Sequence, residues 1–236
     1  MRAIQFQNKR VGSTFLQKAI DSHPDIAGID ELFVNMARKQ GMRKSGFKPF
    51  LRSGYGNTEV YLNNYVYKEA DKENKHTIFK LMYNQINHHQ GLFDYIKRNK
   101  IPIIHLMRKN LVKQVISGLN AATTKHTPIK ITPDKLMHMV KEADSLNKQW
   151  QKNLKGHIKL TLYYEDIIGS SRMGKTYASN NTIVAICNFF KASQYQLFAG
   201  TKKKNKDDIR VYLPNYDKIK EYFKGGQYQW MMDMEK

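Results

Sequence analysis

The chain has 236 residues, of which 41% are hydrophobic and 25% are charged, and its 40 Lys and Arg against 20 Asp and Glu give a net charge of +20. This size suits one packed core, so we expect a single domain over residues 1–236. No apolar run approaches the ~18 residues of a membrane helix. The polar start MRAIQFQNKR lacks the pattern of a secretory signal. We therefore expect a soluble cytoplasmic protein whose partners are anions, such as nucleic acid, acidic lipid surfaces, nucleotides or acidic glycans.

The first predicted elements are a strand, a turn and a helix. Residues 3–7 form an apolar run of strand length, and residues 8–12 are rich in polar and turn-forming side chains. Apolar residues then recur at helical spacing until Pro24, which ends the helix.

Later segments repeat this alternation. Residues 76–82, 101–107 and 157–164 read as buried strands, and a long helix is predicted to begin at Thr132 and Pro133, a capping residue followed by proline in the first turn. Strands that alternate with helices predict an α/β fold with a central parallel sheet flanked by helices.

Two segments predict long loops because they are rich in Gly, Ser and basic residues and have no periodicity. They are residues 41–57 and 169–181, and binding elements or disorder fit them equally well. Cys187 lies in an apolar run, which is typical of a small core residue. Because it is the single cysteine, the chain can form no internal disulfide.

The turn between the first strand and the first helix has the character of a phosphate-binding loop. Its apex is Gly12, where backbone N–H groups and the helix N-terminus can converge on an anion, while hydroxyl and basic side chains add donors and charge. It lacks the two glycines and Gly-Lys-Ser/Thr ending of a Walker loop. The predicted ligand-binding residues here are Lys9, Arg10, Val11, Gly12, Ser13, Thr14 and Phe15.

With its Arg10-Val11-Gly12-Ser13-Thr14 loop, the chain resembles the sulfotransferase superfamily, and most closely the bacterial branch that acts on carbohydrates and lipids. The strand Phe79-Lys80-Leu81-Met82 with Asn84-Gln85, the block Tyr164-Glu165-Asp166 and the tail from Asn215 to Trp230 also resemble that family. The resemblance implies a P-loop-like three-layer domain that uses 3′-phosphoadenosine 5′-phosphosulfate as sulfuryl donor and needs no metal. The acceptor would bear a hydroxyl group, as a glycan or glycolipid does.

The resemblance also implies ligands for the donor's 3′-phosphate. Arg108 and Ser117 match the Arg and Ser that grip this phosphate, although their spacing is one residue longer than in the cytosolic steroid and phenol enzymes, so Lys109 is an alternative to Arg108. A loop that closes over the 3′-phosphate would contain Lys202, Lys203 and Lys204. Which of these lysines makes the contact stays open.

Three residues are candidates for catalysis. Arg10 would neutralise the leaving phosphate, and Glu31 matches the Glu that serves as base in carbohydrate-type sulfotransferases. Lys80, near the end of its strand, would face the transferring group. The structural alternatives are that Asp30 or Glu31 caps a following helix and that Lys80 pairs with a carboxylate at the edge of the core.

Three other functions compete with this interpretation. A kinase-like phosphotransferase would share the sheet and loop, but the chain has no convincing Walker lysine or acidic magnesium ligand. A basic nucleic-acid-binding protein would account for the charge and the 14 tyrosines, but no recognised motif supports it and we expect no nucleic-acid partner. A catalytically inactive relative would not require Glu31. The histidines, including the adjacent His88 and His89, predict no metal site.

Overall fold

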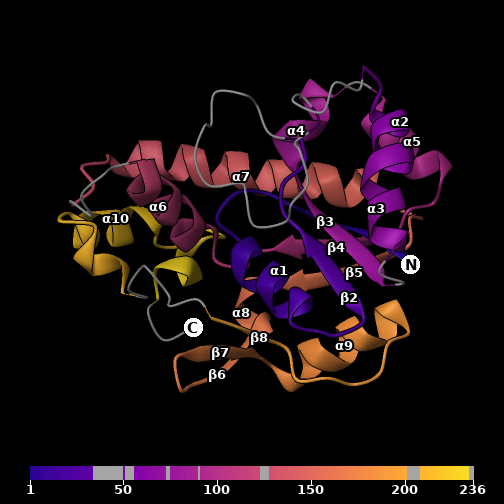
Figure 1. Ribbon diagram of the computed structural model, residues 1–236. Coiled ribbons are helices and arrows are strands. Elements are labelled where there is room, and N and C mark those ends of the chain that lie inside the picture. Colours follow the sequence, from indigo (N-terminus) through magenta and orange to yellow (C-terminus); the bar gives the residue numbers. More distant parts are fainter. Residues whose placement is uncertain are drawn as a thin grey trace. The chain divides into compact units, whose positions relative to one another are not determined.

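The computed structural model describes residues 1–33, 50, 56–72, 75–89, 91–122, 128–200 and 208–233 (Figure 1). The chain divides into two compact units, each made of two stretches. The first unit comprises Met1–Met107 and Gly156–Lys202, and the second comprises Arg108–Lys155 and Lys203–Lys236. The single domain expected from length stays a prediction.

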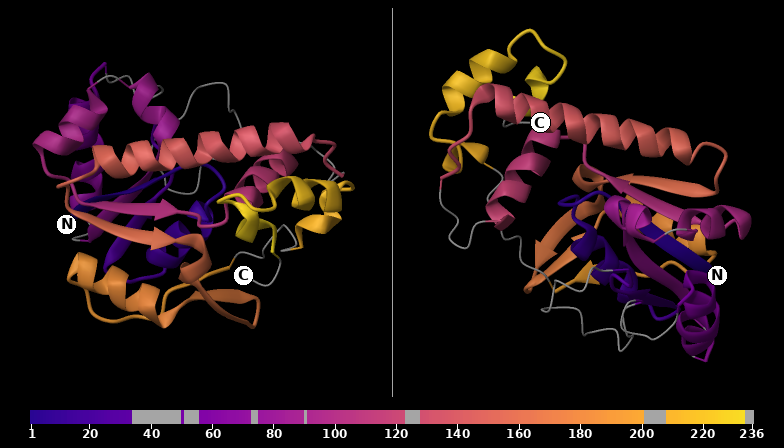
Figure 2. Two further views of the ribbon diagram at one scale, coloured as in Figure 1. Left: turned by 180° about the vertical axis from the view of Figure 1, so that it is seen from behind. Right: turned by 90° about the horizontal axis from the view of Figure 1, so that it is seen from above.

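A five-stranded, all-parallel sheet forms the centre of the first unit, with strand order β2-β3-β1-β4-β5. The strands are β1 (Arg2–Gln7), β2 (Ile26–Ile29), β3 (His76–Met82), β4 (Ile103–Met107) and β5 (Lys159–Tyr163). Figure 2 shows β4 and β5 side by side from behind, in agreement with their parallel pairing. The predicted α/β class with a central parallel sheet is confirmed, and the four predicted strands lie within two residues of the observed ones.

Helices flank this sheet because both of its faces are apolar. Ala3, Ile78 and Ile104 share one face, and they join a buried cluster with residues of α1 and α9. On the opposite face Phe6 contacts Tyr83, the first residue of α4. The helical segments of the unit are α1 (Ser13–Asp21), α2 (Thr58–Tyr61), the π-helix η2 (Leu62–Tyr67), α3 (Lys68–Asp71), α4 (Tyr83–His88), α5 (Leu92–Arg98), α8 (Tyr164–Ile167) and α9 (Asn180–Phe190).

The prediction of a long loop over residues 169–181 is wrong. This segment contains most of an antiparallel hairpin, β6 (Ile168–Arg172) and β7 (Lys175–Ala178), and β8 (Phe198–Ala199) extends it to a small three-stranded sheet. Met173 and Gly174 both have positive φ, 51° and 72°, as the two central residues of a tight hairpin turn require. Of the other predicted loop, residues 41–57, most lie outside the described residues.

The second unit is helical and has a core of its own. In α7 (Pro133–Asn153), the Thr132 hydroxyl accepts the Lys135 N–H at 3.3 Å and Pro133 occupies the first turn, so the predicted start is confirmed. The other elements are α6 (Leu111–Ala122), α10 (Tyr216–Phe223) and the 3-10 turns η3 (Ile209–Val211) and η4 (Gln229–Met232). In the described ranges, no helix combines the length and apolar character needed to cross a membrane.

Candidate functional site at the carboxyl edge of the parallel sheet

The loop after β1, residues 8–12, turns sharply into α1. Arg10 and Gly12 have positive φ angles of 63° and 78°, and α1 begins at Ser13. Because Gly12 is the N-cap and has no side chain, it cannot cap the N–H groups of the first turn, and that turn contains no acidic residue. These N–H groups together with the positive end of the helix dipole favour an anion at this loop, which we call the glycine loop.

Gly12 is also required by a close neighbour. A Cβ atom at this position would lie 2.3 Å from Cδ2 and 2.7 Å from Cε2 of the Tyr164 ring, far inside contact distance. Tyr164 is the first residue of α8, directly after β5, so the Tyr-Glu-Asp block noted in the sequence packs its aromatic ring against the glycine loop. The sequence placed that block only in the family resemblance and did not show this contact.

The predicted loop residues divide into two groups by burial. Val11 and Phe15 are buried in the core cluster, so only their backbone groups could reach a ligand. Lys9, Arg10 and Thr14 are exposed, and Ser13 is half-buried. The exposed group contains the positive charge and the hydroxyl that an anion would meet.

A second feature, at the ends of β2 and β3, is a group of charged and polar side chains. Lys80 of β3 is only 4% exposed, and its Nζ lies 2.5 Å from Asp30 Oδ1 and 4.0 Å from Glu31 Oε1. Asp30 and Glu31 directly follow β2, whose last residue Ile29 pairs with Phe79. The pairing of Lys80 with a carboxylate, one of the alternatives raised by the sequence, is therefore present.

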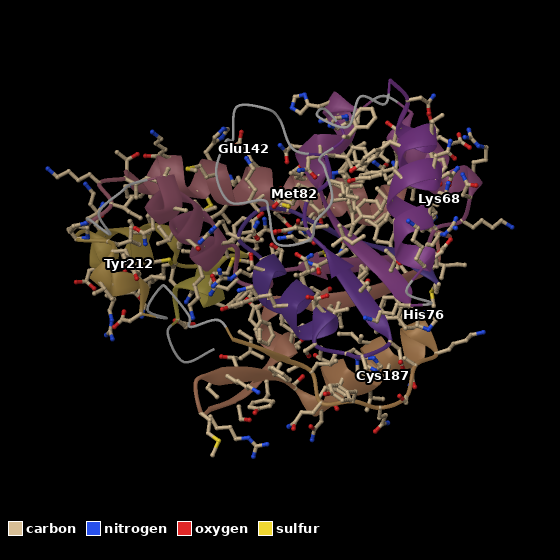
Figure 3. The ribbon with its side chains drawn as sticks, viewed as in Figure 1. Lys68, His76, Met82, Glu142, Cys187 and Tyr212 are labelled. Carbon is tan, nitrogen blue, oxygen red and sulfur yellow. The ribbon has the colours of Figure 1, made fainter. Side chains whose placement is uncertain are left out.

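Gln85 completes this group, which we call the carboxyl-edge cluster: Asp30, Glu31, Lys80 and Gln85. The Gln85 Nε2 donates to Glu31 Oε2 at 3.1 Å, and its Oε1 accepts the backbone N–H of Met82 at 2.8 Å. Sequence reasoning placed Gln85 only in a block of family resemblance and gave it no role. Figure 3 labels the two ends of β3, His76 at the amino end and Met82 at the carboxyl end.

The glycine loop and the carboxyl-edge cluster lie at the same edge of one sheet. β1 and β2 both pair in parallel with β3, and Gln7, at the end of β1, is aligned with Met82. Two strands with one between them are about 10 Å apart across the sheet. In open α/β sheets, ligands bind outside the carboxyl ends of the strands, and here that edge carries an anion-favouring loop and a carboxylate.

Two buried glutamine side chains of β1 lie near this edge of the sheet. Gln5 neighbours Lys80 in the sheet, and its Nε2 donates to the Ser13 carbonyl oxygen at 3.0 Å, which connects β1 to the start of α1. Gln7 is fully buried at the strand end, and its Oε1 has no hydrogen-bond partner among the described residues. Polar groups this deep are costly unless they serve a ligand or a specific structure.

On the other face of the sheet His105 of β4 hydrogen-bonds to the Tyr83 hydroxyl. Burial, and secondarily the positive charge of Lys159, lowers the pKa of His105 from 6.5 to about 4, so the ring is neutral at physiological pH. Burial also raises the pKa of Tyr83. This pair is a neutral structural contact rather than an acid–base couple.

The remaining predicted site residues are in other parts of the chain. Arg108 and Ser117 belong to the second unit, Arg108 as its first residue and Ser117 on α6. Lys202, Lys203 and Lys204 lie outside the described residues. Across the described part of the chain, no three His, Cys, Asp or Glu side chains are grouped so that they could hold a metal ion.

No protein-family model matches the chain, and no curated protein matches it.

Proposed function

We propose that the protein is a sulfotransferase that moves the sulfuryl group of 3′-phosphoadenosine 5′-phosphosulfate to the hydroxyl group of an acceptor. The observation that carries the proposal is that the glycine loop and the carboxyl-edge cluster lie at one edge of the same sheet. An uncapped helix N-terminus suits the anionic 5′-phosphosulfate, and a carboxylate at the same edge of the sheet suits the removal of the acceptor's proton.

Each group then has a role in the transfer. The glycine loop and the first turn of α1, through their backbone N–H groups and Arg10, Ser13 and Thr14, hold the 5′-phosphate and stabilise the negative charge that develops on it. Lys80 faces the transferring group, and Glu31 is the base. The family resemblance assigns the 3′-phosphate to Arg108 and Ser117, with a contribution from Lys202, Lys203 and Lys204.

The step balances without a metal or a redox partner. A lone pair of the acceptor oxygen attacks sulfur and forms a new O–S bond, while the bond between sulfur and the 5′-phosphate oxygen breaks and leaves its electron pair on that oxygen. The acceptor's proton passes to a carboxylate oxygen of Glu31. The products are a sulfate ester and adenosine 3′,5′-bisphosphate, and alignment with charge stabilisation provides most of the catalysis, as in phosphoryl transfer.

The acceptor class follows from the resemblance and the charge. We propose a glycan or glycolipid hydroxyl, acted on in the cytoplasm, and a net charge of +20 favours acceptors that are themselves anionic.

Release of adenosine 3′,5′-bisphosphate from the donor tests this function. Purified protein is incubated with the donor, either with water as the only acceptor or with glycan and glycolipid fractions, and the bisphosphate released is measured. We expect release by the wild type and a loss of about 100-fold or more in Glu31→Gln, as for removal of a general base.

The matched control is Glu59→Gln, because Glu59 is an exposed carboxylate paired with Arg98. It should keep the wild-type rate. No bisphosphate release from the wild type, or equal release from the wild type and Glu31→Gln, would contradict the proposed function.

A further inference from the structure

We infer that Gln85 and Asp30 are positioning residues that prepare Glu31 to accept the acceptor's proton: Gln85 fixes the carboxylate, and Asp30 keeps Lys80 from neutralising it. The inference rests on the proposed function, since it assigns roles within the same site. Neither residue needs to touch the reacting atoms.

The orientation of the Gln85 amide is determined by chemistry. Its Oε1 lies 2.8 Å from the Met82 nitrogen, and a backbone N–H can only donate, so the amide oxygen must face Met82. The Nε2 group is thereby directed at Glu31 Oε2, 3.1 Å away. Gln85 is 6% exposed and sits in the first turn of α4, so burial and the helix cap hold this orientation.

Asp30 accounts for the charge of Lys80. A lysine that is almost fully buried requires a close anionic partner, and Asp30 Oδ1 at 2.5 Å provides it. Glu31 Oε1, at 4.0 Å from Lys80 Nζ, is beyond hydrogen-bond distance. The charge of Lys80 is therefore balanced by Asp30 rather than by Glu31.

The Glu31 carboxylate consequently has two different oxygens. Oε2 accepts the Gln85 amide, whereas Oε1 makes no hydrogen bond within the described residues. The Glu31 side chain is about one-quarter exposed, so solvent reaches part of it. A base held by one oxygen with the other presented to the acceptor loses little orientational freedom at the moment of transfer, which is the advantage of a preorganised site.

Gln85→Glu is the sharpest test of this arrangement. The new carboxylate can still accept the Met82 N–H, so the cap of α4 is retained, but it can no longer donate to Glu31 unless the two carboxyl groups share a proton. We expect bisphosphate release to fall by about 10- to 100-fold at pH 7, with an unchanged KM for the donor. The acid limb of the pH–rate profile should move upward by about one pH unit or more.

Asp30→Asn tests the second half of the inference. With the Asp30 charge removed, Glu31 becomes the nearest carboxylate to Lys80, so release should fall about 10-fold or more while the donor KM stays unchanged. Asn147→Asp is the control for Gln85→Glu, because it also converts an amide of low exposure into a carboxyl group, in this case on α7. It should keep both the rate and the pH profile of the wild type.

The outcomes separate this inference from the proposed function. If the wild type releases no bisphosphate, the sulfotransferase function fails and the inference with it. If the wild type is active and Gln85→Glu keeps its rate and pH profile, only the role of Gln85 is overturned. An Asp30→Asn variant with wild-type kcat overturns the role of Asp30 in the same way.

Discussion

Substituting Gly12 by alanine should both destabilise the fold and disable the glycine loop. The φ angle of 78° is left-handed, which costs an alanine about 1–2 kcal/mol. The added Cβ would lie 2.3 Å from the Tyr164 ring, and forcing such a ring to move costs about 1–3 kcal/mol more. A central value of about 3.5 kcal/mol predicts a fall in Tm of about 7–14 °C for a chain of this size.

Gly91→Ala is the matched control for this experiment. Gly91 is also a helix N-cap with a φ of 78°, but beyond its chain neighbours no atom of the described residues lies within 4 Å of the position of its Cβ. The Gly91→Ala variant should therefore lose only the conformational part, about 1.5 kcal/mol or about 3–6 °C. Thermal unfolding of both variants measures the difference. Equal losses would refute the steric argument, as would a Gly12→Ala/Tyr164→Ala double variant whose loss equals the sum of the single losses.

The remaining predictions concern buried polar groups. Tyr67→Phe removes a buried hydroxyl that has no hydrogen-bond partner among the described residues, so the free energy of unfolding should rise by about 1 kcal/mol. Tyr95→Phe removes a 2.8 Å hydrogen bond to Asn63, so the free energy of unfolding should fall by a similar amount. Denaturant titrations that give changes of the same sign for both variants would contradict this. The pKa of His105 is lowered to about 4 in the folded protein, so between pH 6.5 and pH 4 the unfolded chain binds a proton at this residue that the folded protein does not. The free energy of unfolding should therefore fall by up to about 3 kcal/mol as the pH falls from 6.5 to 4. His105→Phe should lack this part of the pH dependence, and an unchanged slope would show that another group causes it.

The main sheet could be predicted from sequence because buried parallel strands read as continuous apolar runs. The predicted strand 76–82 coincides with β3, and the turn before α1 contains the glycine that the loop requires. The hairpin of β6 and β7 was missed for the opposite reason. Its strands are short and mostly polar, its turn is Met173-Gly174 rather than Asn-Gly, and its third strand comes from a distant part of the chain.

The candidate site could be predicted only in part. Glu31, Lys80 and the glycine loop were identifiable by residue type and position. The role proposed for Gln85 depends on which way its amide faces, and that is determined by the Met82 N–H three residues earlier rather than by any pattern. Likewise, the sequence shows Gln5 and Gln7 as ordinary polar residues, whereas both are fully buried at the strand that leads to the loop.

Nucleotide binding tests the central claim most directly. Calorimetric titration with adenosine 3′,5′-bisphosphate, 5′-AMP and ATP at two salt concentrations compares the ligands, and thermal unfolding provides a second readout. The account predicts selective binding of the bisphosphate at both salt concentrations, with about 2.7 kcal/mol of stabilisation at a hundred times its Kd, and weaker binding by Arg10→Ala and Arg108→Ala. Equal binding of all three nucleotides, or binding that disappears at the higher salt concentration, would contradict it and favour a kinase-like or nucleic-acid-binding protein instead.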